Sequence, residues 1–157
     1  MGSRKNPGRR VRAACVVGAL TLAAVAGGTP AYAGASCGIT GCSSEVNDSA
    51  YSATALKNWC TSGGGTGDLT GTKPTCTVDN VQQTTYFLSS GGGHTPYKED
   101  WDVLQIDAGW CYKVHFIVDF GSDFTKTYDR RGTSAGYVKV SDNADAHVQA
   151  QSTSGCP

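Results

Sequence analysis

Four carboxylate residues lie within a short segment in the middle of the chain, beside two tryptophans. They are Glu99, Asp100, Asp102 and Asp107. A glycosidase cleaves its substrate with two carboxyl groups roughly 5–10 Å apart. Asp100 and Asp102 are two positions apart, so they would lie on one side of a β-strand. Acids are also common at strand ends and turns, and small glycosidases need a longer groove. We therefore favour a structural role and expect no catalytic residue.

A second pattern resembles the site of a serine hydrolase. Residues 132–136 read GTSAG and match the Gly-x-Ser-x-Gly nucleophile elbow around Ser134. That elbow needs a strand before the serine and a helix after it, within a large α/β sheet. Ser134 instead lies between two segments rich in β-forming residues. The pattern therefore predicts a loop between strands.

Residue types that bind metals are present but poorly spaced for it. The histidines His94, His115 and His147 have no partner four residues away, and no cysteine pair has the Cys-x-x-Cys spacing of a zinc site. Calcium could be bound by Asp142, Asn143 and Asp145, but the glycine and the distal glutamate of an EF-hand are missing. A turn is the better interpretation there. We expect no metal and no cofactor.

The first 33 residues have the pattern of a secretory signal peptide. They carry five Lys and Arg residues and no acid, followed by an apolar run over about 13–28 and the small-x-small motif Ala31-Tyr32-Ala33. The apolar run is short for a membrane span and rich in Gly and Ala. We expect cleavage after Ala33 and an extracellular protein.

Loss of the signal peptide changes the charge of the chain. It leaves 157 − 33 = 124 residues, with 13 − 5 = 8 basic against 13 acidic side chains, a net charge of 8 − 13 = −5. An acidic protein has no electrostatic reason to bind nucleic acid or an anionic membrane, and we expect neither as a partner. The length suits a single domain over 45–157.

Six of the seven cysteines follow the predicted signal peptide. They are Cys37, Cys42, Cys60, Cys76, Cys111 and Cys156. An even number in an exported chain predicts three disulfides, for which fifteen pairings are possible. The pairing that we favour among them joins each cysteine to the next one along the chain.

Period-2 alternation predicts β-structure. It is clearest from Trp110 to Phe120, where the even-numbered side chains are apolar or aromatic and the odd-numbered ones include Lys113, His115 and Asp119. Further strands are expected at 101–106, 124–128, 137–140 and 147–151, at 45–59 around a turn near Asn47, and within 77–89. Residues 107–109 should form a hairpin turn. The fold class predicted is all-β, a small antiparallel sandwich or barrel stapled by disulfides.

The segment 34–44 differs from the rest because it is small and uncharged. It cannot bury enough apolar area to order itself, so we expect an extended N-terminal arm. Small side chains would let its backbone enter a narrow cleft and pair there as an added strand. The residues expected to bind a partner are Gly34, Ala35, Ser36, Cys37, Gly38, Ile39, Thr40, Gly41 and Cys42.

The aromatic residues allow two interpretations. The tryptophans Trp59, Trp101 and Trp110 and the tyrosines exceed what one face of a small sheet can cover. Some of them could form an interaction patch. Alternatively, they pack around the disulfides in a thin core.

Several segments together resemble a known family. They are SEVNDS, KNWC, DWDVLQIDAGWCYKV, YDRRG, YVKV and a terminal Cys-Pro, spanning about Ser43 to Pro157. With the early cysteine pair, they resemble the UmbB-like adaptor subunits of the secreted umbrella toxin particles of filamentous soil bacteria. The resemblance implies a non-enzymatic adaptor that joins a lectin-like subunit of trypsin-like fold to a large repeat-containing polymorphic toxin protein. It also implies that an extended N-terminal segment engages one partner.

Two other functions remain compatible with the sequence. A secreted protease or enzyme inhibitor could act through a rigid loop, for which residues 89–100 are the candidate. A small hydrolase could use the acidic segment. An adaptor must hold two different proteins at once, which separates it from an inhibitor.

Overall fold

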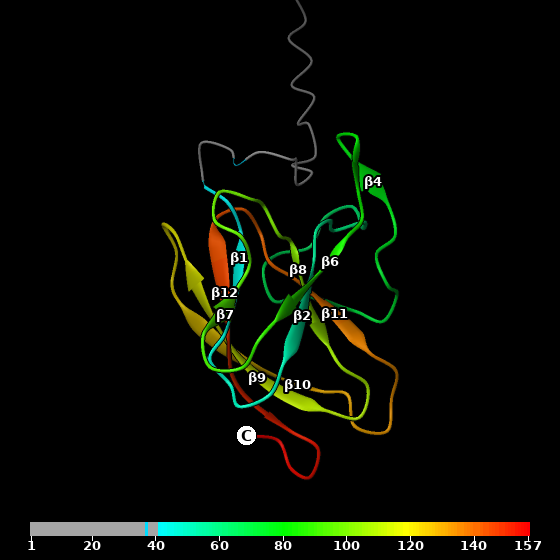
Figure 1. Cartoon of the computed structure of the whole chain (residues 1–157), viewed down its shortest axis with the longest axis vertical. Helices are drawn as coiled ribbons and strands as arrows, with labels where there is room; N and C mark the ends of the chain where they lie inside the picture. The colour runs from blue at the N-terminus through cyan, green and yellow to red at the C-terminus, as the bar shows by residue number, and fades with distance from the viewer. Residues whose placement is uncertain (1–36, 38–40) are drawn as a thin grey trace, which may run out of the picture.

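The computed structural model describes Cys37 and residues 41–157 (Figure 1). The predicted signal peptide at 1–33 and the arm residues 34–36 and 38–40 lie outside the described residues. The described part of the chain is all-β and contains no helix, which confirms the predicted fold class. Among these residues no helix is present that could cross a membrane.

Two five-stranded sheets and a small hairpin make up the domain. One sheet has the order β10 (Phe124–Asp129), β9 (Cys111–Val118), β12 (Ala144–Ser152), β1 (Ser44–Asn47) and β7 (Gly93–His94). The other has the order β3 (Leu69–Thr70), β11 (Gly136–Lys139), β8 (Val103–Ile106), β2 (Ala53–Leu56) and β6 (Thr85–Leu88). The hairpin pairs β4 (Thr77–Val78) with β5 (Val81–Gln82).

One strand pair departs from the expected antiparallel pattern. β1 runs parallel to β12, with Ser44 opposite Asp145 and Asn47 opposite Val148. Parallel neighbours cannot be joined by a tight turn. Here nearly the whole domain forms the connection, so the first and last strands of the domain lie side by side in the middle of one sheet.

The long strand β9 follows the predicted alternation along most of its length. Tyr112, Val114 and Phe116 are buried, whereas the intervening Lys113 and His115 are partly exposed. The two ends of the predicted run differ. Trp110 is only partly buried, and Phe120 is fully exposed with a φ of 60°. The strand stops early because the Gly121 amide bonds back to the Val118 carbonyl at 3.1 Å and closes a turn.

The predicted hairpin at 101–120 is not a hairpin. β8 pairs with β2 and β11, whereas β9 pairs with β10 and β12 in the other sheet. The turn is real: the Trp110 amide bonds to the Asp107 carbonyl at 3.2 Å, and Gly109 has a φ of +83°. It carries the chain from one sheet to the other. Alternation alone does not distinguish these arrangements, because both place one face of each strand on the core.

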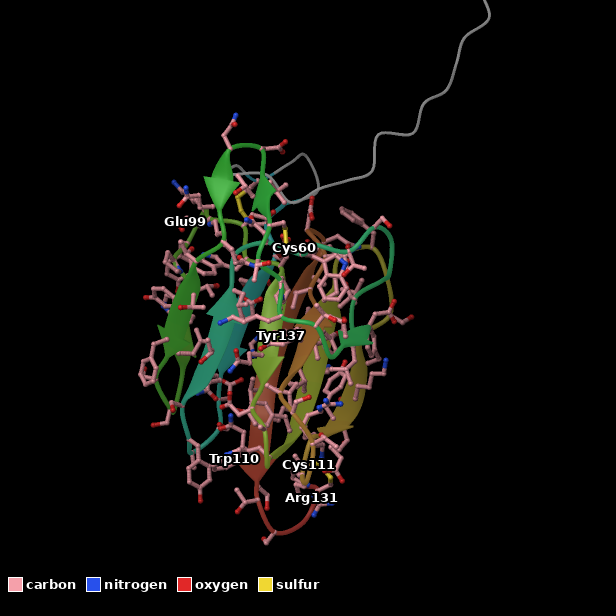
Figure 2. All side chains as sticks on the ribbon, turned by 90° about the vertical axis from the view of Figure 1, so that its right-hand side faces the viewer. Cys60, Glu99, Trp110, Cys111, Arg131 and Tyr137 are labelled. Carbon is pink, nitrogen blue, oxygen red and sulfur yellow. A yellow bond between two sulfur atoms is a disulfide. The ribbon has the colours of Figure 1, made fainter. Side chains whose placement is uncertain are left out.

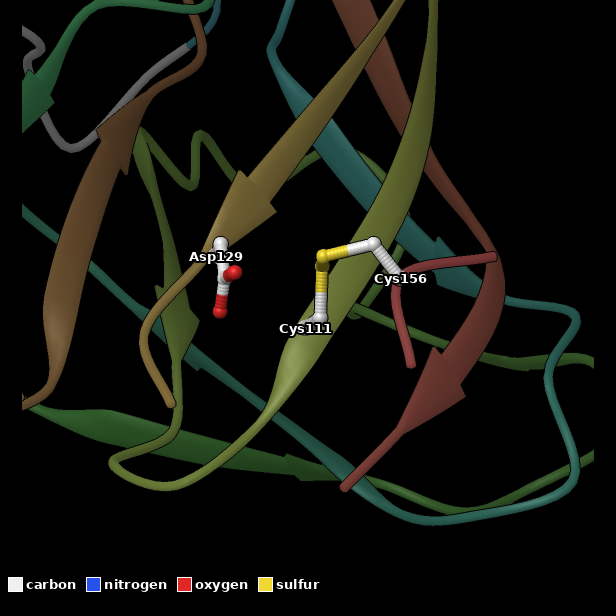
Figure 3. A group of neighbouring side chains, drawn as sticks. All are labelled: Cys111, Asp129 and Cys156. Carbon is white, nitrogen blue, oxygen red and sulfur yellow. A yellow bond between two sulfur atoms is a disulfide. The ribbon is translucent and has the colours of Figure 1, made fainter. Parts of the chain in front are cut away.

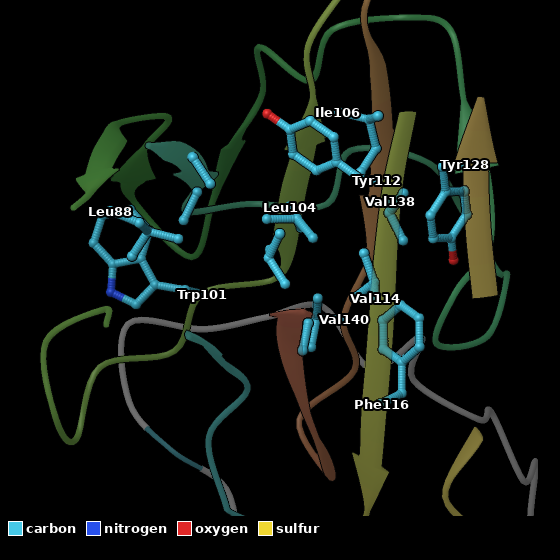
Figure 4. Close-up of a cluster of buried hydrophobic side chains, with 14 of the residues drawn as sticks. Leu88, Trp101, Leu104, Ile106, Tyr112, Val114, Phe116, Tyr128, Val138 and Val140 are labelled. Atoms are coloured by element: carbon cyan, nitrogen blue, oxygen red, sulfur yellow. The ribbon is translucent and has the colours of Figure 1, made fainter. Parts of the chain in front are cut away.

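The core lies between the two sheets (Figure 4). Leu104, Ile106 and Val138 come from one sheet and meet Val114 and Phe116 from the other. These side chains are entirely buried. Burial of these apolar side chains between the sheets favours the folded state of the domain.

Three disulfides join Cys37 to Cys42, Cys60 to Cys76 and Cys111 to Cys156. The two bridges within the domain confirm the pairing that we favoured. Figure 2 shows Cys60 near one end of the domain and Cys111 near the opposite end. One bridge therefore closes the loop before β4, and the other fastens the C-terminus to β9.

The boundary between arm and domain needs correction. Ser43 is completely buried and Ser44 begins β1, although the composition of 34–44 predicts an arm that includes both residues. The domain therefore starts at Ser43 rather than at residue 45. The small side chain of Ser43 fits in the interior, where its amide and hydroxyl bond to Asp100.

Candidate functional site

Three aspartates meet near the point where the arm enters the domain. One carboxylate oxygen from each of Asp100, Asp102 and Asp142 lies within 4.8 Å of the other two. Asp100 and Asp102 immediately precede β8, and each exposes 2% of its surface. Asp142 comes from the turn between β11 and β12 and is partly exposed. We call these three residues the acidic cluster.

Ser43, the first residue of the domain, is bound to this cluster. Its amide nitrogen and its hydroxyl lie 2.9 and 2.8 Å from Asp100 Oδ1, and the hydroxyl is 3.3 Å from Asp102 Oδ1. The amide of Trp59 donates to the other oxygen of Asp102 at 3.2 Å. The segment following the arm is thus held by hydrogen bonds to buried carboxylates.

Glu45 adds a further buried acid. Its exposed fraction is 0%, and neither carboxylate oxygen has a hydrogen-bond partner among the described residues. Burial raises the pKa of Glu45 well above its usual value, and the charges of Asp102 and Asp100 raise it further. Burial also raises the pKa of Asp102 to about 8, assisted by the charge of Asp100. The Asp100 carboxyl has a raised pKa from burial as well.

One lysine lies near these acids. Lys57 lowers the pKa of Glu45 through its charge, which partly offsets the effect of the aspartates. Its ammonium, however, pairs with Glu99 at 3.1 Å and lies 4.6 Å from the centre of the Trp101 ring. The positive charge is therefore shared with a carboxylate outside the cluster.

The acids proposed from sequence as a general acid and base are only partly brought together. Asp100 and Asp102 are neighbours, but Glu99 pairs with Lys57. Asp107 accepts hydrogen bonds from Gln105 at 2.7 Å and from the Tyr112 hydroxyl at 2.8 Å. A sugar polymer cannot contact both Asp100 and Asp102, because each exposes only 2% of its surface in this conformation.

The remaining sequence patterns do not form sites among the described residues. Ser134 lies in the exposed loop before β11, as predicted, and its carbonyl accepts a hydrogen bond from Arg130. Asn143 donates to the Asp119 carbonyl, and Asp145 accepts from the Ser44 hydroxyl. The trio at 142–145 is therefore separated, and only Asp142 joins the acidic cluster. Sequence spacing gave no signal for that grouping, since forty residues separate Asp142 from Asp102.

A second group with metal-ligand residue types has a different explanation. Asp129 lies beside Cys111 and Cys156 (Figure 3). The two sulfurs are bonded to each other, so neither is a free thiolate for a metal. Arg131 donates to both oxygens of Asp129, at 2.9 and 2.7 Å, and these bonds lower the pKa of that carboxyl to about 2.

Most of the exposed aromatic side chains lie at opposite edges of the sandwich, whereas Tyr51, which is 53% exposed, lies between β1 and β2 and packs against Trp110. At the edge formed by β6 and β7, Phe87 is 67% and Tyr97 is 80% exposed, with Tyr86 beside them. We call these three residues the β6–β7 edge surface. At the edge formed by β10, Phe120 is 100% exposed and lies between Ile117 and Phe124 in the chain. We call these three residues the β9–β10 tip.

The tryptophans, by contrast, are mainly structural. Trp59 and Trp101 are buried, and Trp110 packs against the core with part of its surface exposed. The core interpretation therefore fits the tryptophans, and only exposed side chains such as Phe87, Tyr97 and Phe120 remain available for an interaction patch.

An open groove connects the arm to one of these surfaces. It is lined by Cys42 and Ser44 at the start of the domain, by His94 and Asp145, and by Tyr97 and Glu99 from the following loop. Of the nine arm residues predicted to bind a partner, Cys37, Gly41 and Cys42 are described, and the other six lie outside the described residues.

Comparison of the chain with models of protein families, with curated proteins and with solved structures found no match.

Proposed function

We propose that this protein is a secreted, non-enzymatic adaptor of the UmbB-like kind. It would join a lectin-like subunit of trypsin-like fold to a repeat-containing toxin protein in an antibacterial particle. The observation that carries the proposal is the pair of exposed aromatic surfaces at opposite edges of one domain. An adaptor requires two such surfaces, whereas most other functions of a small domain require one.

The first partner would bind the arm and the groove that follows it. The groove begins at Cys42 and reaches Tyr97, so a partner holding the arm in a cleft would also cover this tyrosine. Main-chain pairing would supply affinity, and the exposed aromatic ring would supply a buried anchor.

The second partner would bind the β9–β10 tip. Phe120 has a φ of 60°, which a phenylalanine adopts rarely, and its ring is fully exposed. Burial of this exposed ring in a pocket of the partner would contribute favourable binding free energy.

Secretion is supported by two independent features. The first 33 residues have the composition of a signal peptide. The domain also contains disulfides, which persist in oxidising compartments.

The test is co-purification of the tagged protein from the culture medium of the producing bacterium, followed by mass spectrometry. One variant lacks residues 34–41 and carries Cys42→Ser to avoid a free thiol, and a second carries Phe120→Ser. We expect the first variant to lose one partner and the second variant to lose the other. A matched control, Tyr51→Ser, removes an exposed aromatic ring that belongs to neither surface and should retain both. Loss of the same partner in both variants would contradict the adaptor.

An inhibitor is the second candidate because the loop 89–100 is firmly held. The amides of Gly91, Gly92 and Thr95 donate to the carbonyls of Ser49, Asn47 and Glu45 at 2.7–3.0 Å. This anchoring presents Tyr97 outward, as an inhibitory loop would present its contact residue. An inhibitor would form a binary complex with one enzyme, and Tyr97→Ala would release that enzyme's activity.

A further inference from the structure

We propose that Asp100, Asp102 and Asp142 bind a Ca²⁺ ion, with Glu45 as an additional acidic group behind them. The site lies inside the end of the sandwich where the arm joins the domain. The inference does not rest on the adaptor function, because it concerns only groups within this chain.

The spacing of the carboxylates suits a cation of this size. Ligand oxygens lie about 2.3–2.6 Å from Ca²⁺, so two oxygens on opposite sides of the ion are roughly 5 Å apart. The three aspartate oxygens lie within 4.8 Å of one another. They could therefore contact one ion with only small movements of their side chains.

Glu45 is the independent observation that points to a ligand. It is completely buried, and both of its carboxylate oxygens lack a hydrogen-bond partner within the part of the chain that the structure describes. A buried polar group without a partner is rare and costly in folded proteins. Glu45 and Ser43 lie two residues apart and therefore project from the same side of the chain at β1. Since the Ser43 hydroxyl touches both Asp100 and Asp102, Glu45 is directed into the same interior region.

A cation at this site would offset the negative charge of these buried acids. Three acids here, Glu45, Asp100 and Asp102, expose 2% of their surface or less. The lysine that acts on Glu45 is already paired with Glu99.

The ligand chemistry favours Ca²⁺ over other metals. All the candidate ligands are oxygens, which hard cations prefer, and the group contains no histidine or thiolate to favour zinc. The carboxylates come from two separate loops, so the arrangement is irregular. Ca²⁺ accepts such geometry, whereas Mg²⁺ needs a near-ideal octahedron. Asp142 is partly exposed and gives the ion a path from solvent.

A bound ion would fix the start of the domain. Ser43 already bonds to two of the three aspartates. The backbone at Gly41 passes beside the Asp142 carbonyl, which an added Cβ would approach to 3.4 Å. Calcium would therefore hold the turn at Asp142 and the root of the arm together.

The experiment uses the secreted protein after treatment with a chelator. Calorimetric titration with CaCl₂ should show a single site with a Kd on the order of 10⁻³ M or tighter, the range of extracellular calcium modules. Tb³⁺ should bind the same site and luminesce on excitation of tryptophan, because the Trp59 amide bonds to Asp102 and Trp101 lies between Asp100 and Asp102 in the chain. Asp142→Asn should weaken Ca²⁺ binding about tenfold or more. The matched control Asp79→Asn removes one exposed acid in the β4–β5 turn and should leave binding unchanged.

Asp142 is partly exposed, so its variant should fold, and circular dichroism would verify this. Asp100→Asn provides a second variant with the same expectation. Absence of saturable Ca²⁺ binding at roughly 10 mM would overturn the proposal. Equal Ca²⁺ affinity in Asp142→Asn and Asp79→Asn would overturn the assignment of the ligands. Equal affinity for Mg²⁺ would overturn the assignment of the ion.

Discussion

Buried tyrosines show how single polar atoms are accommodated in this sandwich. The hydroxyl of Tyr112 donates to Asp107 at 2.8 Å, and that of Tyr128 donates to the Gly67 carbonyl at 2.7 Å. Each ring fills the core while its polar atom finds a partner at the margin. Burial raises the pKa of both hydroxyls, and the charge of Asp107 adds to the effect at Tyr112. Both groups therefore favour the neutral form in the folded state.

These shifts predict a loss of stability in alkali. An unfolded tyrosine has a pKa of about 10, and both folded values are higher. The associated stability is fully present below pH 10 and declines as the pH rises above it, by up to about 1.4 kcal/mol per pH unit for each tyrosine. Urea unfolding from pH 9 to 12 would measure the slope. Tyr112→Phe should reduce the slope, and Tyr97→Phe, at an exposed ring, should not. Equal slopes in all three proteins would contradict this account.

Two tryptophans in the same segment should differ in their contribution to stability. Trp101 is buried in the core, so Trp101→Ala should lower the free energy of unfolding by about 3–5 kcal/mol. Trp110 keeps part of its surface in water and packs against Tyr51, with ring centres 4.9 Å apart. Trp110→Ala should cost roughly 1–2 kcal/mol. Thermal unfolding of both variants would measure the difference, and a larger loss for Trp110→Ala would be inconsistent with the core described here.

At the scale of elements, the connections between sheets organise the fold. β1 and β2 are consecutive but lie in different sheets, and so do β8 and β9. Each connection crosses from one layer to the other, so the two sheets cannot form independently. Most contacts in the core therefore join residues that are distant in sequence, which predicts slow folding for a chain of this length.

The turn between β8 and β9 should be sensitive to its backbone conformation. Gly109 has a φ of +83°, and a Cβ added there would meet no atom within 4 Å. Gly109→Ala should therefore cost about 1–2 kcal/mol through the left-handed conformation alone. Gly71 is also open but has no positive φ, so Gly71→Ala should change stability by less than about 1 kcal/mol. Chemical denaturation of both variants would provide the comparison. A similar loss of stability in Gly109→Ala and Gly71→Ala would contradict the claim that a side chain strains the turn at Gly109.

At the scale of the whole molecule, two bridges fasten the ends of the sandwich. Cys60 and Cys76 enclose a separation of 16 residues, and Cys111 and Cys156 enclose one of 45. A bridge restricts the unfolded chain, and the effect increases with the length of the loop. The bridge to the C-terminus should therefore contribute more, because it closes the longer loop.

Replacing each pair by serine tests this order. The loop-length relation predicts a loss of about 3 kcal/mol for the Cys60–Cys76 pair and about 4 kcal/mol for the Cys111–Cys156 pair. Urea unfolding of the two double variants would give both values. If loss of the Cys60–Cys76 bridge lowered the free energy of unfolding clearly more than loss of the Cys111–Cys156 bridge, the first bridge would have to act through packing in the folded state. Its effect on the unfolded chain would then not explain the order.

Local patterns in the sequence determined which side of a strand faces the core and where a turn forms. Alternation of apolar residues placed the core face of β9 correctly at Tyr112, Val114 and Phe116, because a side-chain period of two is a property of the strand itself. The even number of cysteines predicted that they pair, and two bridges of the favoured pairing are present within the domain, although parity alone allows fifteen pairings. The turn at Asp107–Gly109 was predicted by its residue types, since a glycine there readily adopts a positive φ.

Only the tertiary structure decided which strands became neighbours and which acids met. Apolar and polar side chains alternate along a strand in the same way whether the next strand pairs with it or lies in the other sheet. The sequence of 101–120 therefore could not show that β8 and β9 belong to different sheets. The same limit hid the acidic cluster. Asp142 lies beside Asp100 and Asp102 because β11 pairs with β8, and the turn after β11 therefore returns to the start of β8. Pairing energies between distant strands set that arrangement, and no spacing along the chain encodes it.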